Sequence, residues 1–259
     1  MSPVVAVLGL GEAGGAISAD LVAAGVTVRG YDPAVTATGA VVECTSEADA
    51  AKGADVVLSV NSSKAAVDAL RAGLSGTSGA TVWADLNTAA PGLKRELGSI
   101  CGEAGVPFAD VSLMAPVPGK GLFTPMLTSG DGAARYDALL SPLGAKITTL
   151  DGPAGLAATR KLLRSVFFKG AAAAIVEALR AAREAGLEDW LRAHIAEEIA
   201  SWDAAFAQRL EEGSYKHAVR RAEEMRAAGA LLAELDVPSR VADASRDWLD
   251  QLVTEQQNG

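Results

Sequence analysis

Three glycines near the start of the chain have the spacing of a phosphate-binding turn. Gly9, Gly11 and Gly14 form G-x-G-x-x-G directly after the apolar run Val4–Leu8 and before an alanine-rich, helix-prone stretch. The first glycine permits a tight turn, the second lets a pyrophosphate approach the backbone, and the third allows close helix–strand packing. The N–H groups and dipole of the helix start attract phosphates. We therefore expect dinucleotide binding by the turn residues, Gly9, Leu10, Gly11, Glu12, Ala13 and Gly14.

An acidic residue follows the second expected strand, residues 26–31. Asp32 lies roughly 20 residues beyond the turn, where a carboxylate accepts hydrogen bonds from the adenosine ribose of NAD. The same carboxylate would repel the 2′-phosphate of NADP. We therefore expect NAD as the cofactor rather than NADP.

Small polar residues follow another expected strand, residues 55–60. The carboxyl ends of parallel strands face the ligand in sheets of this kind. Asn61 and Ser62, which come directly after this strand, are therefore expected to border the cofactor.

The order of the elements predicts the fold class and two domains. Strand-like and helix-like stretches alternate up to residue 150, as in a parallel sheet with crossover helices. The composition changes at Asp151-Gly152-Pro153, and almost no strand signal follows. We expect an α/β Rossmann-type doubly wound sheet over residues 1–152. An all-α C-terminal domain should follow over residues 153–259.

The all-α part is predicted to contain five helices. Ser201 and Ser214 are the expected start signals of two of them, and Gly213 is an expected stop signal. The predicted helices span residues 154–185, 187–200, 201–212, 214–235 and 238–257.

Cations gather on the first of these helices. Lys161, Ser165 and Lys169 lie at i, i+4 and i+8, within about 80° of arc. We expect this helix to be buried at the domain junction, where a lysine needs an anion or a polar cavity. NAD phosphates or an anionic substrate would supply that anion. The alternative is that some of these cations extend to solvent.

Composition restricts the possible partners. The formal net charge of −9 argues against nucleic acid and anionic membranes as partners. Cys44 and Cys101 lack metal-ligand spacing, so we expect no metal site, but buried thiols in a reducing cytoplasm. No basic segment precedes the first apolar run, and no apolar stretch is long enough to span a membrane.

The chain resembles the 3-hydroxyacid dehydrogenase family, the relatives of 3-hydroxyisobutyrate dehydrogenase and 6-phosphogluconate dehydrogenase. The resemblance rests on the glycine turn, on D-L-N-T-x-x-P over residues 85–91, and on Lys161, and it extends over the whole chain. It implies that Asn87 and Thr88 lie near the nicotinamide. It also implies that Lys161 is the general base in oxidation and the general acid in reduction of a small hydroxy acid.

Two stretches depart from the family pattern. The family's substrate loop reads D-x-P-V-S-G-G, whereas residues 110–116 read D-V-S-L-M-A-P. Ser112, Met114 and Ala115 take the place of that substrate-binding loop. Ser165 stands where the family has Asn, four residues after the lysine, and is the matching substrate contact. Because of these changes, the resemblance does not identify the substrate.

The segment 216–225 resembles a short branch of this family with a phosphogluconate dehydrogenase-like C-terminal domain. His217, Arg220, Arg221 and Glu224 share one helix face. This face is either solvated or reaches a partner subunit's site, as in 6-phosphogluconate dehydrogenase. A small helical domain buries a modest fraction of its own surface, so we expect a homodimer. His217 and Arg221 would then assist binding of an anionic substrate in the other subunit.

Two other functions compete with the dehydrogenase hypothesis. An imine reductase shares the two-domain design but often carries Asp or Tyr at the position of Lys161. A catalytically silent NAD-binding regulator is suggested by the altered loop around Met114.

Overall fold

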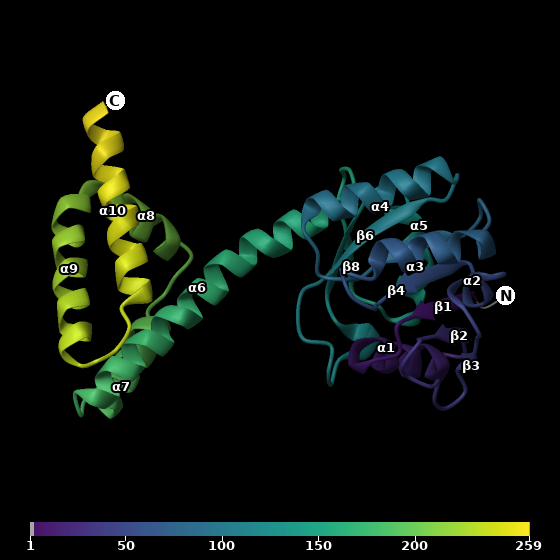
Figure 1. Ribbon diagram of the computed structural model, residues 1–259, viewed down its shortest axis with the longest axis horizontal. Coiled ribbons are helices and arrows are strands. Elements are labelled where there is room, and N and C mark those ends of the chain that lie inside the picture. Colours follow the sequence, from purple (N-terminus) through teal and green to yellow (C-terminus); the bar gives the residue numbers. More distant parts are fainter. Residues whose placement is uncertain (1–2, 259) are drawn as a thin grey trace. The chain divides into compact units, whose positions relative to one another are not determined.

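The computed structural model describes residues 3–258, which divide into two compact units between Arg164 and Ser165. The first unit contains an eight-stranded sheet with helices, and the second is helical (Figure 1). This division lies after the composition change at 151–153, because the first turns of the following helix pack into the sheet domain. Ala157 and Ala158 of those turns are buried.

The sheet has the order β3-β2-β1-β4-β5-β6-β7-β8, with β1 at the point where the strand order reverses. Strands β1 to β6 are parallel, β7 is antiparallel to β6, and β8 is parallel to β7. This arrangement confirms the Rossmann-type doubly wound sheet, and the strands expected over residues 4–8, 26–31 and 55–60 form within one residue of those bounds. The strands are β1 Val4–Leu8, β2 Thr27–Tyr31, β3 Val42–Glu43, β4 Val56–Ser59, β5 Val82–Asp85, β6 Phe108–Leu113, β7 Met126–Ser129 and β8 Ile147–Thr149.

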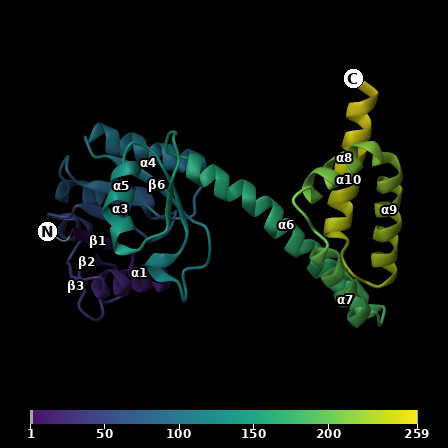
Figure 2. The same ribbon diagram turned by 180° about the vertical axis from the view of Figure 1, so that it is seen from behind.

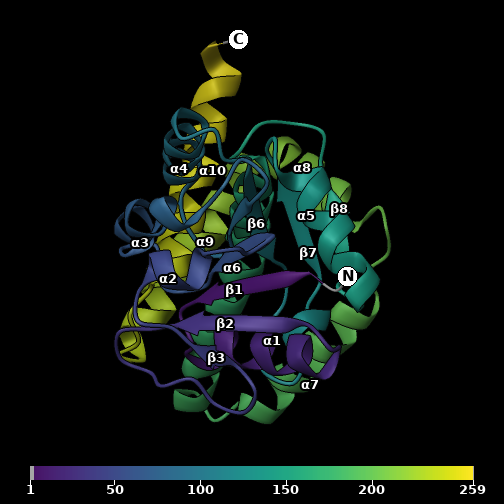
Figure 3. The ribbon, with the colours of Figure 1, turned by 90° about the vertical axis from the view of Figure 1, so that its right-hand side faces the viewer.

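Helices cover both faces of the sheet (Figure 3). Successive strand residues point to opposite faces, so Val5 and Val7 join one core cluster while Ala6 and Leu8 join the other. The first cluster includes residues of α1 and α5, and the second includes residues of α2, α3 and α4. These helices are α1 Glu12–Ala23, α2 Glu47–Ala51, α3 Ala66–Gly73, α4 Pro91–Glu103 and α5 Ala133–Leu140.

The second unit confirms the all-α prediction. Helices α9 and α10 lie side by side along most of their length (Figures 1 and 2). A small core forms from Ala181, Leu232 and Val237, with Leu235 packed against it. The helices of this region are α6 Leu156–Glu184, which begins in the first unit, then α7 Glu188–Ala200, α8 Phe206–Lys216, α9 Ala218–Glu234 and α10 Arg240–Asn258.

Three expected helix signals in this unit are wrong. Helix α8 starts at Phe206 rather than at Ser201, because Asp203 forms the preceding turn and accepts a hydrogen bond from Ala205 N. Gly213 and Ser214 lie inside α8, and Ser214 Oγ donates to Leu210 O at 2.8 Å. A Cβ on Gly213 would lie 3.0 Å from the Arg221 guanidinium, so this glycine permits a close side-chain approach instead of ending a helix.

Both cysteines are buried free thiols, as predicted. Burial raises the pKa of the Cys101 thiol to about 12 and also raises that of Cys44. Within residues 3–258, no helix combines the length and apolar character needed to cross a membrane. The same residues contain no group of three His, Cys, Asp or Glu side chains suited to a metal ion.

Candidate functional site

The three glycines of the turn have different structural roles. Gly9 has φ +99°, and a Cβ there would lie 2.7 Å from the Val60 carbonyl. A Cβ on Gly14 would lie 1.8 Å from the carbonyl oxygen of Gly9, so helix α1 packs directly on the turn. A Cβ on Gly11, in contrast, would meet no atom of residues 3–258 within 4 Å. The protein's own packing therefore does not require a glycine at position 11, but an approaching diphosphate would.

The start of helix α1 also fits a diphosphate. Gly11 is its N-cap residue, and among the described residues no side chain caps it. The first N–H groups of an α-helix have no partner within the helix. Around them, Leu10 is buried, Glu12 is exposed and Ala13 is half-buried. These residues can hold the phosphates of a dinucleotide.

Asp32 is tied to the glycine turn. Its Oδ2 accepts a hydrogen bond from Leu10 N at 2.8 Å. Its Oδ1 accepts from Ala34 N at 2.8 Å and from Val35 N at 3.0 Å. A carboxylate has about four acceptor positions, so these three bonds leave capacity for a ribose hydroxyl. The carboxylate predicted from the sequence is therefore held in a defined orientation beside the turn.

A polar cluster forms where β4 and β5 end. Asn87 Nδ2 lies within hydrogen-bond distance of Asp85 Oδ1 at 2.6 Å, Asn61 Oδ1 at 2.8 Å and Ser59 Oγ at 3.3 Å. The structure thus brings the predicted Asn61 and Asn87 together. Ser62 is used locally instead, since its Oγ accepts from the N–H of Ala65.

Lys161 meets the end of β5 from helix α6. Its Nζ donates a hydrogen bond to Thr88 Oγ1 at 2.7 Å. Lys161 is half-buried and Thr88 is exposed, so the pair lies at the protein surface. Two residues that are 73 positions apart in the sequence, both singled out by the resemblance, are therefore in contact.

A buried charged group lies at the end of β5 and is centred on Lys94, a residue that the sequence did not single out. Lys94 Nζ lies 2.7 Å from Asp85 O, 3.3 Å from Asp85 Oδ2 and 3.3 Å from Asp110 Oδ1. The three side chains are fully buried. Burial raises the pKa of the Asp85 carboxyl, although the Lys94 ammonium acts in the opposite direction. Lys94 has helical spacing with Leu97 and Cys101 on the buried face of α4, but spacing alone does not predict that a lysine is buried.

Asp110 holds the start of α6. Its Oδ2 accepts hydrogen bonds from Gly155 N at 2.9 Å and from Ala158 N at 3.1 Å. Ser129 Oγ, which faces Asp110 across the β6–β7 pair, accepts from Ala157 N. A buried carboxylate at the start of a helix satisfies N–H groups and interacts favourably with the helix dipole. The helix that carries Lys161 is therefore anchored on β6.

The expected substrate-loop residues lie at and beyond the end of β6. Ser112 is buried on the strand, two residues after Asp110 and therefore on the same face. Met114 and Ala115 follow the strand and are half-buried, and Met114 N donates to Pro125 O.

The expected burial of the cationic helix is wrong for the single chain. Beyond its first turns α6 is largely exposed, with Leu163 at 66% and Val166 at 74% relative exposure. Ser165 is half-buried and Lys169 is exposed. The sequence pattern could not show this. An apolar helix face predicts that the face is buried, but not whether the same chain or a second copy buries it.

The predicted site residues of the C-terminal helices lie largely at the surface of the single chain. His217 is exposed in the link between α8 and α9, and Arg220 forms an ion pair with Glu224. Arg221 is half-buried and donates to Ser214 Oγ at 2.8 Å.

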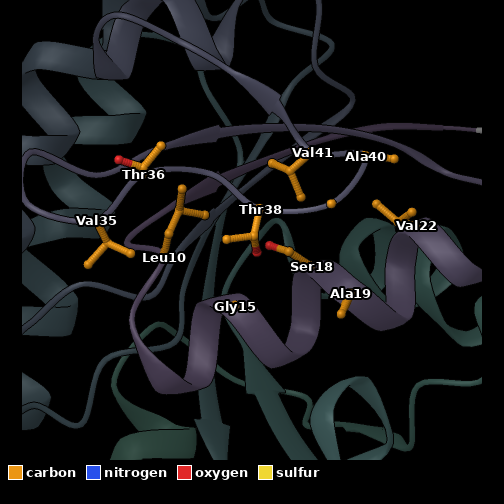
Figure 4. A pocket seen from close by; sticks show the side chains of 11 residues that line it. Leu10, Gly15, Ser18, Ala19, Val22, Val35, Thr36, Thr38, Ala40 and Val41 are labelled. Carbon is orange, nitrogen blue, oxygen red and sulfur yellow. The ribbon is translucent and has the colours of Figure 1, made fainter.

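A separate pocket lies between α1 and residues 35–41 (Figure 4). Its volume is about 230 Å³, and most of its lining is apolar. Ser18 and Thr38 contribute hydroxyl groups to its walls. None of the polar residues at the ends of β4 and β5 lines it, so it is distinct from the cluster around Asn87.

Comparison with known families covers most of the chain. Residues 4–148 match the model of the NAD binding domain of 6-phosphogluconate dehydrogenase. Residues 182–252 match a domain of unknown function, DUF1932. No curated protein matches the chain significantly.

Solved structures of similar fold cover nearly the whole chain. The conserved protein MTH1747, of unknown function and similar to 3-hydroxyacid dehydrogenases, is 26% identical with a TM-score of 0.62, covering 98% of each chain. An imine reductase from Myxococcus stipitatus, a variant in complex with NAD⁺, is 19% identical with a TM-score of 0.80, covering 98% of this chain and 95% of its own. A reductive aminase from Aspergillus terreus, in complex with NADPH and ethyl levulinate, is 17% identical with a TM-score of 0.76 and the same coverage.

Proposed function

The chain belongs to the family defined by the NAD binding domain of 6-phosphogluconate dehydrogenase, and from this premise we propose that it is a dehydrogenase of a small hydroxy acid. It has the NAD(P)-binding dehydrogenase fold and is an oxidoreductase of the 3-hydroxyacid dehydrogenase-like group. Its specific activity is hydride transfer between NAD and a small hydroxy acid, with Lys161 as the general acid and base. The contact between Lys161 Nζ and Thr88 Oγ1 carries this proposal.

The cofactor is held by residues that follow four strands, β1, β2, β4 and β5. Gly11 and the start of α1 bind the diphosphate, and Asp32 binds the adenosine ribose. NAD held there would supply the chemistry of hydride transfer through its nicotinamide ring. Two further pairs, Asn61 with Ser62 and Asn87 with Thr88, border the cofactor. NAD is preferred over NADP because the Asp32 carboxylate repels a 2′-phosphate.

Lys161 moves the proton in this reaction. In oxidation it takes the proton from the substrate hydroxyl, and in reduction it returns a proton to the carbonyl oxygen. Thr88 orients the ammonium group through the 2.7 Å hydrogen bond. The location of this pair at a strand end supports its role, because ligands of doubly wound sheets bind outside the carboxyl ends of the strands.

The substrate is a small anion. Ser112, Met114 and Ala115 follow Asp110 toward the end of β6 and form one side of its site. Ser165 and Lys169 extend the face of α6 on which Lys161 lies, and Lys169 contributes positive charge.

The active form is a homodimer in a reducing cytoplasm. Large apolar side chains are exposed in the single chain, among them Val166, Phe167, Phe168, Trp190 and Trp248. A surface of this composition supports burial against a second copy. His217 and Arg221 then assist substrate binding in the partner subunit.

A Lys161→Ala variant tests the proposed reaction. We expect turnover of a hydroxy acid found by library screening to fall by about 100-fold or more, with the Kd for NAD within about threefold of wild type. Lys146→Ala, which removes an exposed lysine of the same unit, is the matched control and should keep full turnover. Near-normal turnover by Lys161→Ala would remove Lys161 from the mechanism. Turnover of cyclic imines, but of no hydroxy acid, would identify an imine reductase instead.

A further inference from the structure

We propose that Lys94 is a positioning residue that joins Asn87 to the start of α6, and through α6 to Lys161. The inference rests on the proposed function, because its effect is exerted on the reaction assigned to Lys161. It adds a residue that touches neither substrate nor cofactor.

Lys94 is enclosed between α4 and the sheet. It lies on the buried face of α4 with Leu97 and Cys101, and its side chain has 0% relative exposure. Lysine is almost never fully buried unless it is paired, because transferring its charge out of water is costly. Its burial therefore indicates that the surrounding acceptors hold the ammonium group.

Two carboxylates on neighbouring strands provide that pairing. Asp85 of β5 and Asp110 of β6 are register partners in the parallel sheet, so both point to the same face. Lys94 Nζ lies 3.3 Å from Asp85 Oδ2 and 3.3 Å from Asp110 Oδ1. A buried ammonium group that lies between two carboxylates is paired with both of them. Lys94 thus links the two carboxylates.

The first carboxylate orients Asn87. While Oδ2 of Asp85 faces Lys94, its Oδ1 accepts hydrogen bonds from Asn87 Nδ2 at 2.6 Å and from Asn87 N at 3.2 Å. The side-chain amide of Asn87 is therefore fixed by a carboxylate that Lys94 holds in place. Asn87 directly precedes Thr88, the hydrogen-bond partner of Lys161.

The second carboxylate anchors the helix of Lys161. While Oδ1 of Asp110 faces Lys94, its Oδ2 binds Gly155 N and Ala158 N at the start of α6. Lys161 lies one turn beyond Ala158, so a shift of the helix start moves its ammonium group relative to Thr88. Small displacements of reacting groups cost a large part of the rate. Lys94 therefore contacts both the carboxylate that orients Asn87 and the carboxylate that anchors the helix of Lys161.

A double-mutant cycle between Lys94 and Lys161 separates positioning from stability. Lys94→Met keeps an unbranched side chain, one atom shorter than that of lysine, and removes the charge. If Lys94 acts through Lys161, Lys94→Met should lower kcat by about tenfold or more in the wild-type background. It should lower kcat by less than about threefold in the Lys161→Ala background, and change the Kd for NAD by less than about threefold in both.

Leu97→Ala is the matched control, because Leu97 is equally buried on the same face of α4. It should reduce stability while leaving kcat per folded molecule unchanged. If Lys94 were only structural, Lys94→Met would behave like Leu97→Ala, and that result would overturn the proposal. An equal loss of kcat in both backgrounds would overturn it as well.

Asp110→Asn covers the case in which Lys94→Met does not fold. The amide oxygen can still accept from Gly155 N and Ala158 N, whereas the charge that faces Lys94 is lost. The same non-additivity with Lys161→Ala is expected, and additive losses would refute the coupling. Full kcat in Lys161→Ala would instead refute the role of Lys161 in the proposed function. Loss of kcat in Lys161→Ala but not in Lys94→Met would refute this inference alone.

Discussion

Lys161 Nζ and Thr88 Oγ1 form a 2.7 Å hydrogen bond that joins helix α6 to the end of strand β5. Neither residue is buried, so the bond lies where a ligand can reach it. The lysine and the threonine come from distant parts of the sequence, and the buried group of Asp85, Lys94 and Asp110 contacts both β5 and the start of α6. A hydrogen bond between two anchored elements can hold a proton-transferring side chain in one orientation.

Thr88→Val should weaken catalysis without weakening the fold. Valine has the shape of threonine but lacks the acceptor for Lys161 Nζ, so we expect kcat to fall by about tenfold, equivalent to about 1.4 kcal/mol. Steady-state kinetics and thermal melting measure the two effects. Thr88→Ser, which keeps the hydroxyl, should retain most of the rate. Equal losses in both variants would show that the methyl group matters rather than the hydrogen bond.

Gly11→Ala should separate cofactor binding from folding. A Cβ at Gly11 meets no atom of the described part of the chain within 4 Å. The melting temperature should therefore change by less than about 2 °C, while the Kd for NAD rises about tenfold or more. Gly9→Ala should destabilise the chain by about 1–3 kcal/mol, since Gly9 has φ +99° and lies against Val60. Gly102→Ala, in open space on α4, is the control for both measurements. Normal NAD affinity in Gly11→Ala would contradict the assigned diphosphate site.

Asp32 should determine the choice between NAD and NADP. We expect wild type to prefer NAD by about tenfold or more in kcat/KM, because ribose hydrogen bonds and charge repulsion together exceed about 1.4 kcal/mol. Asp32→Asn keeps an acceptor for Leu10 N but removes the charge. The ratio of kcat/KM with NAD to kcat/KM with NADP should therefore decrease. Asp32→Ala also loses the bond to the turn and should weaken the binding of both cofactors. Equal kinetics of wild type with NAD and NADP would contradict the prediction.

Both thiols should be unreactive in the folded protein. Burial raises the pKa of Cys44, and it raises that of Cys101 to about 12, so almost no thiolate is present at pH 8. A thiol-reactive disulfide reagent should label native protein slowly and label two thiols per chain in urea. Fast labelling of one thiol in native protein would contradict this, and Cys44→Ser would then identify which thiol reacts.

Light scattering should give the mass of a dimer at micromolar concentration. The exposed side chains of Val166 and Trp248 are expected to be covered by the second copy.

If Arg221 reaches the partner's site, Arg221→Ala should raise the substrate KM by about tenfold without changing the mass of the dimer. Arg220→Ala, which breaks an exposed ion pair with Glu224, is the control and should leave KM unchanged. A monomer mass would refute the dimer, and an unchanged KM in Arg221→Ala would refute the role of Arg221 alone.

The sequence alone was sufficient for the sheet and for the turn at its centre. Buried parallel strands are short, continuous apolar runs, and the turn after β1 has its glycines at a fixed spacing, with φ +99° at Gly9 and Gly14 packed on the Gly9 carbonyl. Both signals depend on neighbouring residues and can therefore be recognised without a structure. Helix starts in the second unit were less predictable. Several polar residues near each boundary could cap the helix, and only the folded structure shows which of them does so. Asp203 forms the turn before α8, whereas Ser201 does not.

Only the tertiary structure decided which charges act together. A lysine at position 94 reads as a surface residue of α4 until β5 and β6 place Asp85 and Asp110 beside it. The cost of burying a charge is offset by partners that are distant in sequence and close in space, so its burial cannot be inferred from local pattern. The same holds for Lys161: the family resemblance implied proton transfer by this residue, whereas its contact with Thr88 is seen only in the structure, in which Asp110 also anchors α6 on β6.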